Sequence, residues 1–67
     1  MRVTKEMKER VERRFDIRFE RKGKFYFFYY QEECEIWILD IYVDDEIDET
    51  IFLDTDQEVI EEIKDIK

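Results

Sequence analysis

The chain has 67 residues, 48% of them charged, and its formal net charge at pH 7 is −8. This length predicts a single small domain over residues 1–67 with one core, and the acidic balance argues against a general nucleic-acid-binding protein. No apolar run is long enough for a membrane span, and Met1 leads straight into charged residues rather than a signal peptide. With a single cysteine that has no partner for a disulfide, these features predict a cytoplasmic protein without membrane contact.

Ala, Ser, Asn, His and Pro are absent from the sequence. Heavy use of Lys, Glu and Arg is typical of proteins from high-temperature organisms. The composition as a whole is also typical of an AT-rich genome, such as that of a phage or an archaeal virus. A designed sequence is the alternative origin.

The charge is divided unevenly along the chain. Residues 1–24 carry ten basic and five acidic side chains, whereas residues 25–67 carry two basic and fifteen acidic ones. Such asymmetry indicates either a macromolecular partner or two solvated faces that differ in charge.

The first predicted element is a helix that Thr4 caps and that runs to about Arg14. Its apolar positions are spaced by four and form a narrow stripe, which Phe15 continues: Val3, Met7 and Val11. This helix is therefore expected to pack by one edge only.

Strict alternation over residues 15–21 predicts a strand, and Gly23 supplies the positive φ of a hairpin turn. The resulting register pairs Phe19 with Tyr26, Ile17 with Phe28, and Phe15 with Tyr30. A second turn near residues 32–33 pairs Tyr30 with Glu35, Phe28 with Trp37, and Tyr26 with Leu39. We expect Trp37, Phe28 and Leu39 to lie at the centre of the core.

A five-residue acidic loop over residues 44–48 is predicted to lead to a fourth strand at residues 49–54, with Val43 opposite Glu49. Thr55-Asp-Gln-Glu58 is a capping box for a last helix, whose apolar stripe comprises Val59, Ile60, Ile63 and Ile66. The predicted fold is an α+β domain in the order helix, four-stranded antiparallel meander, helix, with both helices mainly on one face of the sheet.

The second face of the predicted sheet is also apolar. It carries Phe25, Phe27, Tyr29, Ile36, Ile38, Tyr42 and Phe52, of which Phe27 and Ile38 are expected to be direct neighbours across strands. Soluble monomers rarely leave an apolar patch of this size in water. We expect an interface here, either a homodimer or a partner, through Phe25, Phe27, Tyr29, Ile36, Ile38 and Tyr42. The alternative is a three-layer domain with one helix on each face.

Residues for catalysis and for metal binding are scarce. Without His or Ser, the standard nucleophile–base pairs cannot be assembled, so we expect no enzymatic activity. Cys34 alone cannot form a zinc site, and the acidic segment at residues 44–49 lacks the glycine of a calcium loop. No metal or cofactor is expected.

These features favour a non-catalytic binding or inhibitor protein that blocks a basic, nucleic-acid-handling protein partner. Carboxylates of this protein would take the place of phosphates on the partner, as in nucleic-acid mimicry. The apolar sheet face would contribute a second part of the binding surface. The candidate acidic residues are Asp44, Asp45, Glu46, Asp48, Glu49, Glu58, Glu61 and Glu62.

Two alternatives stay open. The first is a small nucleic-acid-binding protein that uses a basic set, Arg10, Arg13, Arg14, Lys22 and Lys24. The second is a designed or structural domain without a partner.

Overall fold

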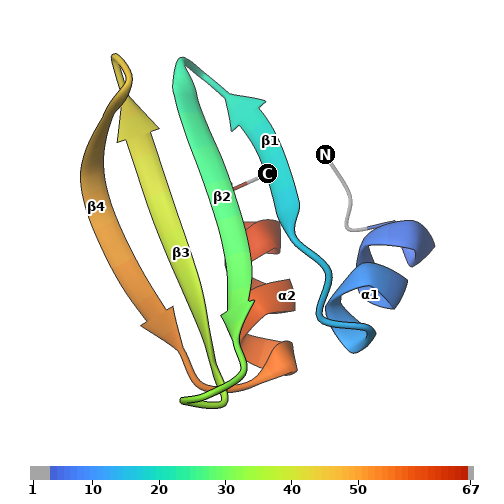
Figure 1. Cartoon of the computed structure of the whole chain (residues 1–67). Coiled ribbons are helices and arrows are strands. Elements are labelled where there is room, and N and C mark those ends of the chain that lie inside the picture. Colours follow the sequence, from blue (N-terminus) through green and yellow to red (C-terminus); the bar gives the residue numbers. More distant parts are fainter. Residues whose placement is uncertain (1–3, 67) are drawn as a thin grey trace.

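The computed structural model describes residues 4–66. The elements are α1 (Lys5–Glu12), β1 (Ile17–Arg21), β2 (Lys24–Gln31), β3 (Ile36–Val43), β4 (Glu46–Leu53) and α2 (Asp56–Ile66). The strands form one antiparallel sheet in the order β1-β2-β3-β4. In Figure 1, α2 lies behind the sheet and α1 lies beside it, next to β1, so the side toward the viewer carries no helix. The predicted α+β meander is confirmed, and the alternative with one helix on each face is wrong.

The core lies between the sheet and the helices. Val11 of α1 and Val59 and Ile63 of α2 are fully buried in the same cluster as the inward side chains of the strands. Trp37, Phe28 and Leu39 are also fully buried, which confirms their predicted place at the centre. The two helices therefore cover one face, here called the inner face.

Helix α1 begins and ends through local hydrogen bonds. The Thr4 hydroxyl accepts from the Met7 N–H at 3.2 Å, as predicted for an N-cap. At the other end, the Arg14 N–H donates to the Val11 carbonyl at 3.0 Å and the Phe15 N–H donates to the Arg10 carbonyl at 2.9 Å. This is a Schellman motif, with Arg14 in the left-handed region at φ 59°.

The Schellman motif turns the chain away from the helix before Phe15. Phe15 therefore lies in the connection to β1, where its side chain is 49% exposed. The prediction that Phe15 belongs to the strand and to the core was wrong, and its pairing with Tyr30 does not form. Val3, predicted on the same stripe, lies outside the described residues.

The first hairpin has the predicted register, with Ile17 opposite Phe28 and Phe19 opposite Tyr26. Its turn residues Lys22 and Gly23 have φ values of 51° and 80°. Positive φ at both positions is the property of a type I′ turn, whose twist matches that of the strands.

The second hairpin is displaced from its predicted register. Its turn spans the four residues 32–35, one residue later than expected, so Phe28 pairs with Leu39 and Tyr30 with Trp37. The exposed Cys34 lies in this turn. Each strand nevertheless presents the predicted face, because a shift of two residues preserves the alternation of side chains.

The predicted five-residue acidic loop was wrong. Asp44 and Asp45 alone form the turn, with φ values of 52° and 66°, and Val43 pairs with Glu46 rather than with Glu49. The strand partners shift between Ile41 and Tyr42, where β4 holds an extra residue. This bulge keeps Ile51 and Leu53 on the inner face. The short turn brings Glu46 and Asp48 into β4 instead of the predicted loop.

Helix α2 begins at the predicted cap. The Thr55 hydroxyl accepts from the Glu58 N–H at 3.1 Å. The Glu58 carboxylate accepts from the Asp54 N–H at 2.8 Å, one residue before the donor that a capping box uses. Both residues of the link between β4 and α2, Asp54 and Thr55, are thereby hydrogen-bonded to the first turn of the helix.

Candidate functional site

The face of the sheet without helices, here called the outer face, is largely apolar. Phe25 is 40%, Ile47 55% and Phe52 64% exposed, and the other members are half-buried against one another. Ile47 pairs with Tyr42 through the bulge; sequence reasoning missed it because it stood in a predicted loop. The apolar residues of the outer face are Phe25, Phe27, Tyr29, Ile36, Ile38, Tyr42, Ile47 and Phe52.

Aromatic rings on this face contact one another along and across strands. The ring centroids of Phe27 and Tyr29 are 5.0 Å apart, and those of Phe25 and Tyr42 are 6.1 Å apart in an edge-on arrangement. The Arg18 guanidinium carbon lies 5.1 Å from the centroid of Phe27, which is a cation–π distance. These contacts restrict the positions of the rings.

A carboxylate lies among these apolar side chains. Asp40 is only 7% exposed and stands opposite Phe27, so the predicted pairing of Phe27 with Ile38 was wrong. Its Oδ1 accepts from the Thr50 hydroxyl at 2.9 Å. Burial raises the pKa of the Tyr29 hydroxyl, and the charge of Asp40 and its hydrogen bond with Tyr29 raise it further. Tyr29 therefore keeps its proton and contributes a donor to this carboxylate.

The eight predicted acidic residues fall into three groups. Asp44 and Asp45 form the turn between β3 and β4. The second group, Glu46, Asp48 and Glu49, lies on the edge strand β4, and the third, Glu58, Glu61 and Glu62, lies on α2.

Carboxylates from β4 and α2 lie near enough to influence one another. Burial raises the pKa of Glu62, and the negative charges of Asp65 and Glu49 raise it further. Glu49 and Glu62 are 13 residues apart in the sequence, so only the packing of α2 beside β4 brings them together. We give the name acidic flank to the set of carboxylates on these two elements that comprises Glu46, Asp48 and Glu49 of β4 and Glu61, Glu62 and Asp65 of α2.

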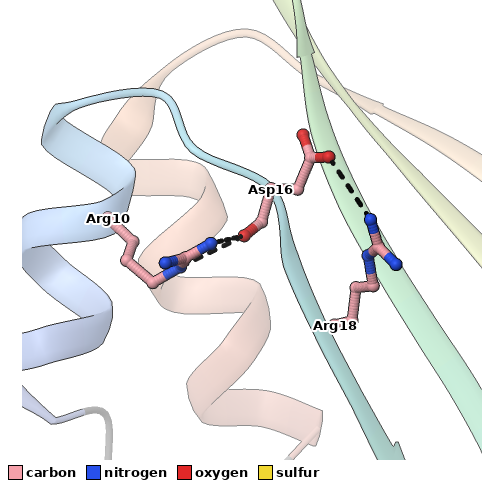
Figure 2. A network of polar contacts seen from close by, with 3 residues as sticks. All are labelled: Arg10, Asp16 and Arg18. Carbon is pink, nitrogen blue, oxygen red and sulfur yellow. Dashed lines mark hydrogen bonds and ion pairs between the residues drawn. The ribbon is translucent and has the colours of Figure 1, made fainter.

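Several basic side chains are engaged within the protein. Figure 2 shows Arg10 and Arg18 on two sides of Asp16. The Arg10 Nε and Nη2 atoms donate to the Asp16 carbonyl at 3.2 and 2.6 Å, and Arg18 Nη2 is 3.8 Å from the Asp16 carboxylate. The Arg14 guanidinium carbon lies 4.5 Å from the ring centroid of Tyr30.

The basic candidates are also divided between two places. Arg10, Arg13 and Arg14 belong to the end of α1 that precedes β1, whereas Lys22 lies in the turn at the other end of β1 and Lys24 directly after it. Five residues of strand separate the two sets, which is about 17 Å at the usual rise per residue. They do not form a single basic patch.

The surface offers no enclosed site for a small molecule among the described residues. A hollow on the outer face is lined by Arg18, Glu20, Phe25, Phe27, Tyr42, Asp44 and Asp45, and it opens to solvent. Over residues 4–66, carboxylates and the cysteine do not gather into a group of three or more that could hold a metal ion. Neither α1 nor α2 is long and apolar enough to cross a membrane.

Comparison of the chain with models of protein families, with curated proteins and with solved structures gave no match. The arrangement of charge and apolar surface is therefore the physical basis on which a function can be assigned.

Proposed function

We propose that this protein is a non-catalytic binding protein whose acidic flank docks on the basic surface of a nucleic-acid-handling protein and blocks it. Carboxylates arranged along β4 and α2 would occupy positions that phosphates take on that surface. Complementary fields speed such an encounter and suppress other partners. An inhibitor carried by a phage or an archaeal virus is the kind of protein that this arrangement fits.

The crowding of Glu49, Glu62 and Asp65 is the observation that supports this proposal. Like charges held close together disfavour each other's ionised state and so reduce stability at neutral pH. A net charge away from zero is enough for solubility and does not require carboxylates from two elements to be adjacent. A binding role gives a reason for this crowding that neither stability nor solubility provides.

Direct binding of nucleic acid has less support. Arg10 and Arg14 are committed to contacts inside the protein, and the Lys22–Lys24 turn is too far from them to extend the same patch. With a net charge of −8, the whole molecule also repels a phosphate backbone.

The test is capture of partners from a bacterial and an archaeal cell extract, read by mass spectrometry. The bait is the whole chain, compared with a variant that neutralises the flank by Asp48→Asn, Glu49→Gln, Glu61→Gln and Glu62→Gln. A matched control removes the same number of charges elsewhere, by Glu6→Gln, Glu9→Gln, Glu12→Gln and Glu20→Gln. These control positions are all exposed, on α1 and β1.

We expect wild type and control to retain nucleases, polymerases or other basic nucleic-acid-binding proteins, and the flank variant to lose them. Added duplex DNA should displace the captured protein, because both ligands would occupy the same basic surface. Equal retention by the flank variant, or no displacement by DNA, would overturn the proposal. Recovery of nucleic acid itself, lost as salt rises, would favour the alternative.

A further inference from the structure

Strand β4 has a neighbouring strand on one side only. It pairs with β3 and forms one edge of the sheet, and in Figure 1 no other described element lies along its outer side. The opposite edge differs, because β1 has five residues and α1 lies next to it, whereas β4 has eight residues. Over residues 4–66, the long open edge of the sheet is therefore that of β4.

The open edge is regular over most of its length. The bulge lies near the start of β4, and pairing with β3 is continuous from Glu49 to Leu53. This stretch spans about 17 Å at the usual rise per residue. In a regular antiparallel strand, alternate residues direct their N–H and C=O groups away from the paired neighbour. The edge therefore offers hydrogen-bond donors and acceptors to a further strand.

Apolar side chains are exposed beside this edge. Ile47 at 55% and Phe52 at 64% are the most exposed large apolar side chains of the described residues. Proteins usually protect an open edge with charge, a bulge or a covering element, because an exposed apolar edge pairs with other strands. In β4 the charge and the bulge lie in the first half, and residues 50–53 carry no charge. This second half of β4 is open to pairing.

The charge of β4 decides which kind of strand fits. The strand contains Glu46, Asp48 and Glu49 and no basic residue, and Glu62 of α2 lies near enough to be influenced by the charge of Glu49. A second copy of β4 would bring three more carboxylates to the same seam, and like charges across paired strands are destabilising. A basic strand would bring opposite charges there. Charge complementarity therefore favours a basic segment over a copy of this chain.

We propose that an extended basic segment of the protein partner pairs with the open edge of β4 and adds a fifth strand to the sheet. This inference rests on the proposed function for the kind of partner, and it adds the means of binding. Neighbouring side chains on paired strands share a face of the sheet. Glu49 pairs with the inward Ile41, and Phe52 pairs with Ile38 of the outer face. The added strand therefore has basic side chains on the inner side, beside Glu49, and apolar side chains on the outer side, beside Phe52.

The first experiment follows the isotope-labelled chain by NMR during titration with a short peptide in which lysine alternates with valine. We expect the amide signals of residues 49–53 to change most and their hydrogen exchange to slow, because a paired N–H is protected. A peptide with glutamate in place of lysine should bind at least about tenfold more weakly. Equal binding of the two peptides, or changes centred on α2 instead of β4, would overturn the proposal.

Backbone pairing is tested separately from charge. Two further peptides keep every side chain of the lysine–valine peptide and carry N-methyl groups on alternate residues, one on the odd and the other on the even positions. A strand directs alternate N–H groups to opposite edges, so pairing with β4 uses one of these two sets. One methylated peptide should therefore bind about tenfold or more weakly than the other. Equal affinities would mean attraction between charges without strand addition, and would overturn the proposal.

The carboxylates of β4 are tested with a matched pair of variants. Asp48→Asn with Glu49→Gln should weaken binding of the lysine–valine peptide by about threefold or more. Glu9→Gln with Glu12→Gln removes the same charge from exposed positions of α1, beside the opposite edge of the sheet, and should bind nearly as wild type does. Equal weakening by the two variants would overturn the assignment to β4.

The apolar part of the contact has its own control. Phe52→Ala should weaken the peptide by about threefold or more, whereas Phe15→Ala, at a similarly exposed ring in the connection from α1 to β1, should leave binding unchanged. Circular dichroism verifies that each variant is folded. Loss of peptide binding at β4 overturns strand addition even where capture from the extract depends on the acidic flank, so this failure is distinct from failure of the proposed function.

Discussion

The indole N–H of Trp37 donates a hydrogen bond to the carboxylate of Asp56 across 2.9 Å. Trp37 is fully buried in the sheet, and Asp56 is the first residue of α2. The bond gives a partner to a donor that water cannot reach, and it fixes the start of α2 against the end of the sheet next to the turn between β2 and β3.

Removing the acceptor leaves that donor unpaired. Asp56→Ala should lower the free energy of unfolding by about 1–3 kcal/mol, the usual cost of a buried polar group without a partner. Asp56→Asn keeps an acceptor and should lose less. Denaturant unfolding at neutral pH measures both, with Gln57→Ala in the same turn as control; an Asp56→Ala variant as stable as this control would contradict the prediction.

Trp37 itself carries more of the stability. Trp37→Ala should cost about 3–5 kcal/mol, because a fully buried ring is replaced by a cavity at the centre of the core. Thermal unfolding within a few degrees of wild type would show that the ring is not central to packing.

The acidic flank makes stability depend on pH. Burial, together with Asp65 and Glu49, raises the pKa of Glu62 above its ordinary value. A raised pKa in the folded state means that the contribution of Glu62 to stability is greatest below its unfolded pKa and is lost as pH rises through its folded pKa. Glu62→Gln should therefore be more stable than wild type at pH 7, and the difference should vanish as the pH is lowered into the range where the carboxyl is protonated in both states.

The measurement is thermal unfolding at a series of pH values. Glu61→Gln, one residue away and exposed, is the control and should show a smaller effect. A gain in Glu62→Gln that is the same at every pH would mean that charge is not its cause.

Both tight turns should be more stable with glycine than with another residue at the position of positive φ. Gly23 has φ 80° and open space where a Cβ would stand, so Gly23→Ala should cost about 1 kcal/mol through the backbone alone. Asp45 has φ 66° with a side chain, so Asp45→Gly should gain about 0.5–1 kcal/mol for the same reason. Urea unfolding of both variants is the check, and a loss of stability in Asp45→Gly would contradict the turn geometry.

The cap of α2 offers a prediction with a conservative control. Thr55→Ala removes the acceptor of the Glu58 N–H and should cost about 1 kcal/mol. Thr55→Ser retains the hydroxyl and should unfold at nearly the wild-type denaturant concentration. Equal losses in the two variants would assign the effect to the methyl group rather than to the cap.

Local pattern alone determined the element order and the inward side of each strand. Alternation with a period of two placed Phe28, Trp37 and Leu39 on one face, and a register error of two residues left that assignment intact. Gly23 marked its turn because glycine adopts positive φ at little cost. The caps at Thr4 and Thr55 were visible because their partners lie three residues away.

Only the tertiary structure decided the register of β3 with β4, the exposure of Phe15 and the contacts of α2 with the sheet. Asp44 and Asp45 form a tight turn without glycine, so its position carried no local signal, and the register of β3 with β4 was lost with it. Phe15 continued both the apolar stripe of the first helix and the alternation of the first strand. The Schellman motif at the end of α1 decided that its side chain is exposed. Trp37 meets Asp56, and Glu49 meets Glu62, only because α2 packs back on the sheet. Contacts between residues far apart in the chain depend on how whole elements pack, and the spacing of residues within one element does not contain that information.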